Sequence, residues 1–204
     1  MKRLFVVYSC YALLLAAVFC MSGYADSAAY QDMIYHPGRL KAVDSLLNVK
    51  VGQTAPDFTL PSINGEPVSL SRFKGKHNVV LSFVPAAWTP VCSDQWPGYN
   101  LAQPLFEKHD AVVLGISVDN IPTLFAWTRK MGRLWFEVLS DFWPHGAVSS
   151  QFGVLRSDGM SERALFIIDK QGIIRFIHIS DINVRPDLGM IAAELEKIPP
   201  SSAQ

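Results

Sequence analysis

Cysteine is scarce in this sequence of 204 residues, which contains only three. Cys10 and Cys20 lie in the first apolar run of the chain, and Cys92 stands alone beyond it. Exported proteins often use cysteines in pairs as disulfides. A lone cysteine excludes an intramolecular disulfide beyond that run and leaves two interpretations, a reactive thiol or a small buried apolar residue.

An excess of charge of either sign is also lacking, because 18 Lys and Arg balance 18 Asp and Glu. A neutral chain offers no electrostatic footprint for nucleic acid or for an acidic membrane surface. The sequence contains no glycine-rich phosphate loop, and its five histidines show no paired metal-ligand spacing. We therefore expect no nucleic-acid partner, no metal site and no cofactor.

The first 25 residues have the layout of a secretory signal peptide. Lys2-Arg3 provides a basic start, and residues 4–20 form an apolar run. Gly23-Tyr24-Ala25 places small residues at −3 and −1 of a cleavage site, with Asp26 next. Cleavage after Ala25 predicts a protein that is exported to the periplasm or the exterior and has no membrane contact afterwards.

Two alternatives to cleavage remain. An uncleaved membrane anchor would leave the protein tethered, although the run is short of the roughly 20 apolar residues that span a bilayer. A lipoprotein would be acylated at Cys20, but Phe19 stands where small residues are expected. Cleavage by a signal peptidase fits the sequence better than either.

The remaining chain predicts an N-terminal extension, one domain and a loose tail. Residues 26–50 form the extension, in which residues 42–49 could make a short amphipathic stretch. The domain covers residues 51–198. The tail 199–204 begins with two prolines and is rich in serine, so we expect it not to pack.

Short apolar segments predict the strands of this domain. Phe58-Thr59-Leu60 and Val68-Ser69-Leu70 flank Asn64-Gly65, which is a hairpin signal. Residues 78–84 and 111–118 are too apolar for strands with one exposed face. Such runs suggest the centre of an α/β sheet that is covered on both sides.

The later segments complete the fold class. Residues 121–131 predict a helix with Pro122 in its first turn. Residues 163–168 and 173–178 predict an antiparallel strand pair, and residues 185–198 predict a closing helix with one apolar face. The order indicates an α/β protein with a mixed central β-sheet and helices on both faces, as in thioredoxin-like folds.

The loop after the strand 78–84 carries the candidate site. Pro90 suits the start of a helix, which would place Cys92 in the first turn. Free N–H groups and the positive end of the helix dipole favour an anion there, and the thiolate is the nucleophilic form of cysteine. A helix end contributes at best about 2 kcal/mol. Ionising an ordinary thiol near neutral pH takes more, so a nearby cation is required.

The spacing Pro85-x-x-x-Thr89-x-x-Cys92 resembles the active-site motif of peroxiredoxins. The resemblance implies that Cys92 attacks the terminal oxygen of a hydroperoxide, that the Thr89 hydroxyl and backbone amides hold the substrate, and that Pro85 shields the thiolate. Residues 161–169 resemble the segment that supplies a distant arginine in this family, which assigns that role to Arg163.

Residues 140–154 resemble the alkyl hydroperoxide reductase E-type subgroup in particular, and the similarity covers roughly residues 50–197. The resemblance implies a one-cysteine thiol peroxidase without cofactor, which forms a sulfenic acid. An external thiol or a thioredoxin- or glutaredoxin-like protein would reduce it, and a homodimer is expected. Val91, Trp88 and Gln95 are further candidates for the substrate-binding site.

Two positions depart from the family pattern. Gln95 stands where a glutamate is frequent, and Pro97 stands where relatives with a local resolving cysteine carry it. With no second cysteine beyond Cys20, the reductant must come from outside. Pro97 and Pro104 also predict a kink or break in the helix that follows Cys92.

Less specific interpretations compete at several residues. Arg163 alone could be an exposed charge at a strand edge, and Thr89 could be only a helix N-cap. Trp88 and Trp143 suit packing or an interface better than catalysis, although both could line an apolar substrate entrance. His145, between a proline and a glycine, fits a surface turn better than a general base.

Two other functions compete with peroxide reduction. A membrane-tethered thiol–disulfide oxidoreductase would carry Trp-Cys-x-x-Cys, but Thr89 stands where its first cysteine should be. A redox-inert binding module or chaperone-like scaffold would have no need for Pro85, Thr89 and Arg163 together. Peroxide turnover, insulin reduction and thiol titration distinguish the three.

Overall fold

The computed structural model describes residues 30–198, so the predicted signal peptide and the tail 199–204 lie outside the described residues. Contacts divide the chain into two units, residues 1–35 and 36–204. In the first unit, residues 30–35 begin with a short helical turn. Within residues 30–198, no helix has the length and apolarity that crossing a membrane requires.

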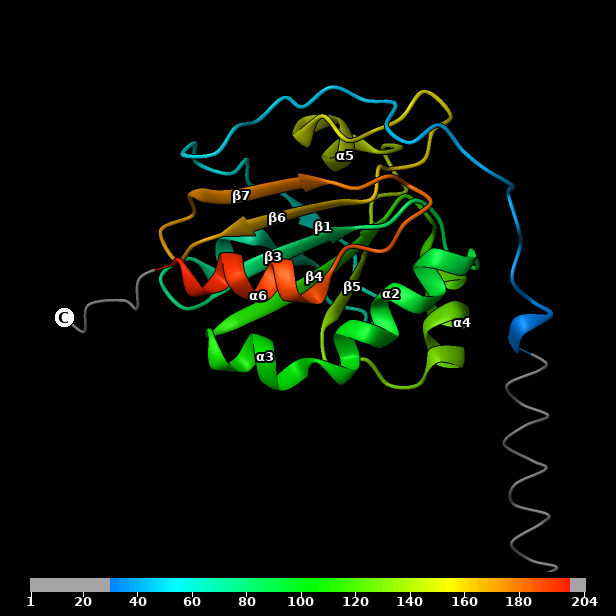
Figure 1. Ribbon diagram of the computed structural model, residues 1–204, viewed down its shortest axis with the longest axis horizontal. Helices are drawn as coiled ribbons and strands as arrows, with labels where there is room; N and C mark the ends of the chain where they lie inside the picture. Colours follow the sequence, from blue (N-terminus) through cyan, green and yellow to red (C-terminus); the bar gives the residue numbers. More distant parts are fainter. Residues whose placement is uncertain (1–29, 199–204) are drawn as a thin grey trace, which may run out of the picture. The chain divides into compact units, whose positions relative to one another are not determined.

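The second unit contains a five-stranded mixed sheet and a separate two-stranded hairpin (Figure 1). Its elements follow along the chain in the order β1 (Thr59–Leu60), β2 (Val68–Ser69), the 3-10 helix η1 (Leu70–Phe73), β3 (Asn78–Phe83), α2 (Pro90–Leu101), α3 (Gln103–Lys108), β4 (Ala111–Ser117), α4 (Ile121–Met131), β5 (Glu137–Ser140), α5 (Ala147–Phe152), β6 (Ala164–Ile168), β7 (Ile174–Ile179) and α6 (Leu188–Glu196).

The large sheet has the strand order β5-β4-β3-β6-β7. Strands β3, β4 and β5 are parallel, whereas β6 runs antiparallel to both β3 and β7. Figure 1 shows α5 on one side of the sheet and α2, α3 and α6 on the other. The mixed sheet with helices on both faces and the hairpin β1–β2 are confirmed.

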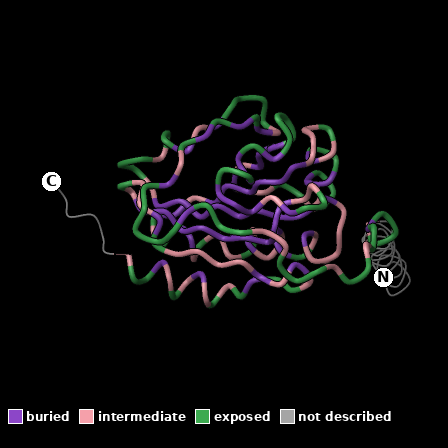
Figure 2. Tube along the Cα trace, turned by 90° about the horizontal axis from the view of Figure 1, so that it is seen from above, coloured by how far each residue is buried: buried purple, intermediate pink, exposed green. Residues whose placement is uncertain are grey.

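The side chains of β3 alternate between the two faces of the sheet, and both faces are covered. Every residue of β3 is buried, and successive side chains point to opposite faces. Phe83 packs against Phe152 of α5, with ring centroids 5.7 Å apart. On the opposite face the Ser82 hydroxyl accepts a hydrogen bond from the indole of Trp96 in α2. The buried centre of the sheet is visible in Figure 2.

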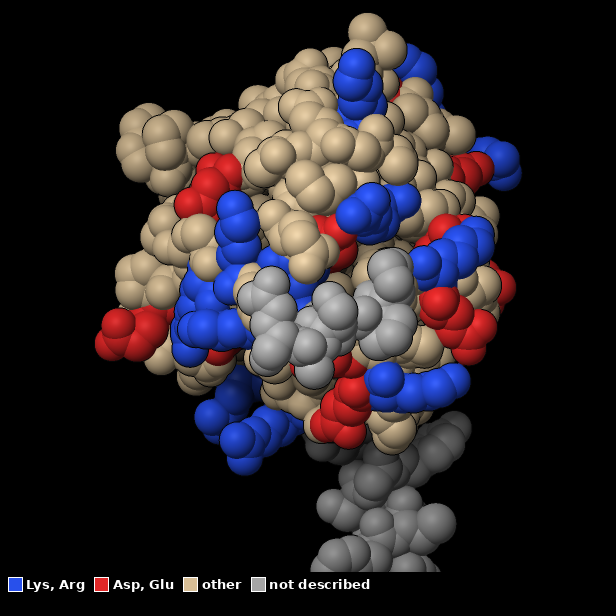
Figure 3. All heavy atoms as spheres, turned by 90° about the vertical axis from the view of Figure 1, so that its left-hand side faces the viewer, with Lys and Arg blue, Asp and Glu red and all other residues tan. Residues whose placement is uncertain are grey.

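The sheet register brings distant parts of the chain to one end of the molecule. Phe83, the last residue of β3, pairs with Ala164, the first residue of β6. Arg163 therefore lies beside the loop that leads from β3 into α2. The opposite end, where β6 turns into β7, shows acidic and basic side chains interspersed (Figure 3). The candidate site lies away from that mixed-charge face.

Three local predictions need correction. Residues 42–49 form no amphipathic face, because most of their apolar side chains are exposed, and the backbone bonds to the domain, as from Asn48 N to the Phe152 carbonyl. Helix α6 begins at Leu188 rather than at residue 185, because the Asp187 carboxylate caps it by accepting from Gly189 N. Helix α2 continues through Pro97, but the predicted break is present before Pro104, because α2 ends at Leu101 and α3 begins at Gln103.

The boundary predicted at residue 50 is not marked by a loss of contacts. The segment before it is hydrogen-bonded to the domain at both backbone and side chains, and the compact unit begins at His36. The division into extension and domain remains a prediction about the sequence. The signal peptide remains a prediction as well.

Gly153→Ala tests how closely this segment packs. Gly153 has φ +73°, and a Cβ there would lie 2.3 Å from both the Asn48 nitrogen and the Leu46 carbonyl oxygen. Backbone strain and overpacking together should lower the free energy of unfolding by about 2–4 kcal/mol in denaturant titrations. Gly52→Ala is the control, because Gly52 has φ +87° but open space around it. Equal losses in the two variants would show that the contact with residues 46–48 is unimportant.

Candidate active site

Helix α2 places Cys92 in its first turn with the side chain facing inward. Thr89 is the N-cap and Pro90 the first helical residue, so Cys92 is the third. The buried residues of this helix follow the spacing i, i+3, i+4, i+7, and they are Cys92, Gln95, Trp96 and Tyr99. Cys92 belongs to that stripe and has no exposed surface. Cys92 lies in the first helical turn, where backbone N–H groups have no partner within the helix.

The guanidinium of Arg163 contacts this sulfur. Its Nη2 lies 3.4 Å from the Cys92 Sγ, although the two residues are 71 positions apart. Arg163 is 2% exposed. Its Nη1 donates to the Gln95 Oε1 at 2.6 Å, and its Nε and Nη2 donate to the Ile182 carbonyl at 3.1 and 3.0 Å. The interpretation of Arg163 as an exposed strand-edge charge is wrong.

The guanidinium of Arg163 is buried without a paired carboxylate from residues 30–198. Among the described residues, no carboxylate forms a salt bridge with this guanidinium, and its oxygen acceptors are a neutral amide and a backbone carbonyl. A buried charge without a counterion costs several kcal/mol. The sulfur of Cys92, when ionised, is the group in contact that can supply the negative charge.

Gln95 orients the Arg163 guanidinium by accepting a hydrogen bond from it. Its Nε2 donates to the Ser82 hydroxyl at 3.1 Å and to the Tyr99 hydroxyl at 3.0 Å, which turns its Oε1 toward Arg163. Burial raises the pKa of Tyr99 to about 12, against the lowering effect of its hydrogen bonds with Gln95 and Ser82, so the phenol stays neutral. Gln95 was a candidate for substrate binding, but it is fully buried and its contacts are those of a positioning residue.

A carboxylate that the sequence analysis missed fixes the loop between β3 and α2. Asp119, which follows β4, accepts a hydrogen bond from the Ala87 backbone nitrogen at 2.7 Å. Thr89 donates its hydroxyl to the Ala86 carbonyl at 2.8 Å, and it makes no side-chain cap to α2. Trp88, which lies between Ala87 and Thr89, has a positive backbone φ of 59°. The Thr89 hydroxyl hydrogen is therefore used within the loop, which leaves its oxygen free to accept.

A cavity of about 410 Å³ opens beside the guanidinium. The residues around it are His36, Pro37, Gly38, Arg39, Leu40, Pro85, Thr89, Pro90, Val91, Met160, Arg163, Ile182 and Asn183. The lining thus includes four of the candidate site residues together with a segment from the N-terminal side. Trp88, Gln95 and Cys92 itself are not part of it.

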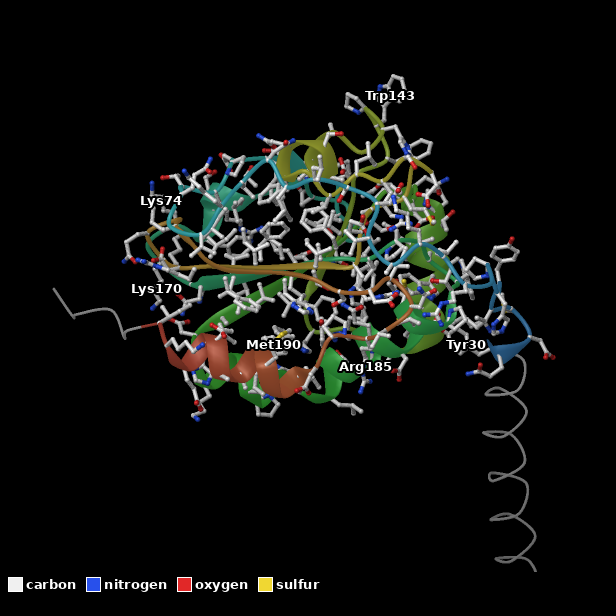
Figure 4. All side chains as sticks on the ribbon, turned by 45° about the horizontal axis from the view of Figure 1, so that its top comes forward. Tyr30, Lys74, Trp143, Lys170, Arg185 and Met190 are labelled. Carbon is white, nitrogen blue, oxygen red and sulfur yellow. The ribbon has the colours of Figure 1, made fainter. Side chains whose placement is uncertain are left out.

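The remaining candidates lie elsewhere. Trp143 is 81% exposed and projects away from the domain, so it does not line the cavity (Figure 4). The His145 ring bonds through Nε2 to the Gly159 carbonyl at 2.7 Å, as expected of a surface turn. Within the described part of the chain, no group of three metal-ligating side chains comes together.

Comparison with known proteins identifies the family. Residues 51–177 match the model of the AhpC/TSA family. The chain belongs to the AhpC/TSA family. Alkyl hydroperoxide reductase E of Mycobacterium tuberculosis is 43% identical over 129 residues, which are 63% of this chain and 84% of the relative.

Two further relatives agree. Peroxiredoxin TSA1-B of Candida albicans is 38% identical over 144 residues, covering 66% of this chain and 72% of the relative. The reduced 2-Cys peroxiredoxin of Plasmodium vivax is similar with a TM-score of 0.67 and 28% identity, over 72% of this chain and 80% of the other. The resemblance seen in the sequence is confirmed, and the fold is thioredoxin-like.

Gln95→Glu tests how this peroxiredoxin uses the charge of Arg163. A carboxylate at position 95 would pair with the guanidinium and lie near the sulfur, so it would disfavour the thiolate. We expect the midpoint pH of Cys92 alkylation to rise by roughly one unit. Asp94→Asn, at the exposed neighbour that pairs with Arg185 (2.8 Å), is the control and should change the midpoint little. An unchanged midpoint in Gln95→Glu would mean that the neutral amide has no electrostatic role.

Proposed function

We propose that this peroxiredoxin reduces hydrogen peroxide and organic hydroperoxides by a one-cysteine mechanism, with Cys92 as the redox-active residue. The observation that carries the proposal is the 3.4 Å contact between the Cys92 sulfur and a buried guanidinium that lacks a carboxylate partner. That contact supplies a positive charge to stabilise the thiolate, because the end of a helix alone contributes too little.

In the first step the Cys92 thiolate attacks the terminal oxygen of the hydroperoxide. A sulfur–oxygen bond forms while the oxygen–oxygen bond breaks, and two electrons pass from sulfur to the peroxide. Cys92 becomes a sulfenic acid, and the leaving oxygen takes up a proton to give water or an alcohol. Arg163 Nη2 lies where it can stabilise the negative charge that moves onto the departing oxygen.

The cavity residues orient the peroxide for this attack. The Thr89 oxygen can accept the hydroperoxide hydrogen because its own hydrogen is bonded to the Ala86 carbonyl. Pro85 and Val91 line the same cavity and limit access of water to the sulfur. Gln95 holds the guanidinium rather than contacting the substrate, and Trp88 does not line the cavity.

In the second step an external thiol reduces the sulfenic acid. It forms a mixed disulfide with Cys92 and releases water, and a second thiol then releases the reduced enzyme and a disulfide. The sequence supports an external reductant because it has no cysteine after Cys92. A small thiol or a thioredoxin- or glutaredoxin-like protein fits this role, and a homodimer is expected from the family.

The proposed setting is outside the cytoplasm. The basic start, the apolar run and the small residues before Asp26 support export and cleavage after Ala25. In the processed chain Cys92 would be the one remaining cysteine. The mass of the exported protein tests this, because cleavage gives a chain that begins at Asp26.

The mechanism is tested by oxidising reduced, exported protein with peroxide in the absence of reductant. One equivalent of peroxide should be consumed per chain, and a sulfenic-acid trap should label Cys92 once. Thiols and thioredoxin-like proteins are then added to restore turnover. A disulfide-linked dimer formed in stoichiometric yield, or no labelling at all, contradicts the one-cysteine mechanism.

A further inference from the structure

A segment before the family-matched region forms one wall of the cavity. We call residues 36–44 the strap. Its residues 36–40 line the cavity together with Pro85, Thr89 and Arg163, whereas the family match begins only at residue 51. This part of the substrate pocket therefore comes from chain that the family model does not include.

The strap is fixed beside the catalytic guanidinium by a short segment after β7. The Asn183 side chain accepts from the Leu40 backbone nitrogen at 3.1 Å and donates to the Leu40 carbonyl at 3.0 Å. The Ile182 nitrogen donates to the Ala42 carbonyl at 3.0 Å. The Ile182 carbonyl in turn accepts both hydrogen bonds from Arg163.

A buried ion pair holds the other end of the strap. Arg156 and Glu162 are both buried and pair at 2.8 Å. Arg156 Nη2 also donates to the Lys41 carbonyl, and the Asp44 nitrogen donates to the Glu162 carboxylate. With backbone and side-chain anchors at both ends, the strap is a defined wall of the cavity.

The cavity lining contains basic residues but no acidic ones. Its ionisable residues are His36, Arg39 and Arg163, all of them bases, and no carboxyl group lines the cavity. Arg163 is buried, while Arg39 and His36 are exposed, so the bases lie at different depths. Asp181 lies near enough to Arg39 and to Arg163 for both charges to lower its pKa, but it forms no salt bridge with either and is not part of the lining.

The other lining residues are mostly apolar. Besides Thr89, Asn183 and Gly38 they are Pro37, Leu40, Pro85, Pro90, Val91, Met160 and Ile182. A cavity with apolar walls and an exposed arginine in its lining favours a ligand with an apolar body and an anionic group.

We propose that Arg39 is a specificity-determining residue, which binds the anionic group of an apolar hydroperoxide while the peroxide end meets Arg163 and Cys92. The strap brings Arg39 to the cavity, and Asn183 keeps the strap in place. This inference rests on the proposed peroxidase function and adds a charge preference to it.

The test uses a matched pair of substrates, cumene hydroperoxide and its para-carboxylate derivative, which differ in charge at one end. Stopped-flow oxidation of Cys92 gives a rate constant for each. In the wild-type protein the carboxylate should react about threefold faster, the effect of one ion pair at an exposed site. In Arg39→Gln the ratio of the two rate constants should fall to about one.

Two controls separate local from general charge effects. Arg39→Lys keeps the positive charge and should keep most of the ratio. Arg72→Gln removes an exposed arginine of η1, which does not line the cavity, and should leave the ratio unchanged. High salt should shrink the ratio in wild type but not in Arg39→Gln.

A ratio near one in wild type, or an undiminished ratio in Arg39→Gln, overturns the role of Arg39. Failure of the proposed function looks different, because then neither hydroperoxide nor hydrogen peroxide oxidises Cys92 in the wild-type protein.

Discussion

Cys92→Ser loses peroxide reduction by at least about 10⁴-fold, as expected when the nucleophile of an enzyme is removed. A hydroxyl is a far weaker nucleophile than a thiolate, and no other cysteine follows the first 20 residues to replace it. The rate is measured by peroxide consumption in the presence of a reducing thiol. The substitution changes one buried atom and leaves the packing of α2 intact.

The stability of the same variant provides a second measurement. Serine leaves the buried guanidinium of Arg163 without the anion that the sulfur provides, so Cys92→Ser should be less stable than wild type by about 1–3 kcal/mol near neutral pH. Peroxide consumption at the wild-type rate in a folded Cys92→Ser protein would exclude Cys92 as the nucleophile. Unchanged stability would argue against an ion pair.

The sequence predicts the parts of this site that are local in the chain. Pro85, Thr89 and Cys92 lie within eight residues at a strand-to-helix junction, so their spacing fixes their neighbourhood. The closeness of Arg163 depends on the antiparallel pairing of β6 with β3, which no local pattern encodes. Only the resemblance to a family pointed to it.

Contacts through the backbone escaped the sequence analysis. The Ile182 backbone carbonyl accepts hydrogen bonds from Arg163. Every residue has such a carbonyl, so the amino-acid type at position 182 does not predict this contact. The strap is held by a hydrogen bond between Leu40 and Asn183, which are 143 residues apart. Residues 42–49, which overlap the end of the strap, also differ from the prediction, because Leu46 is 88% exposed and the apolar side chains there share no buried face.

Some of the positioning network could have been found from spacing. Gln95 and Tyr99 are four residues apart on a predicted helix, so their side chains lie on one face and can bond. Asp119 offered a weaker signal, because a carboxylate after a buried strand lies at the carboxyl edge of the sheet. Neither spacing says which group the amide or the carboxylate bonds to.

Arg163→Met should lower the rate constant for Cys92 oxidation by about 10²- to 10³-fold, as seen when one donor is lost from a preorganised site. Opposite charges about 4 Å apart interact by roughly 4 kcal/mol at an effective dielectric of 20, and desolvation offsets part of this. Methionine has similar reach and removes the charge. Stopped-flow oxidation by hydrogen peroxide over a range of pH measures the loss.

The pH dependence separates the two roles of the guanidinium. Raising the pH ionises Cys92 without help, so it should restore the part of the rate that was lost through a smaller thiolate fraction. The remaining deficit reflects the charge on the leaving oxygen, which Arg163→Met cannot stabilise at any pH. Arg163→Lys keeps the charge but cannot bond to Gln95, Ile182 and the sulfur together, so its rate should be intermediate. A folded Arg163→Met protein that oxidises as fast as wild type would mean that the contact with the sulfur has no catalytic consequence.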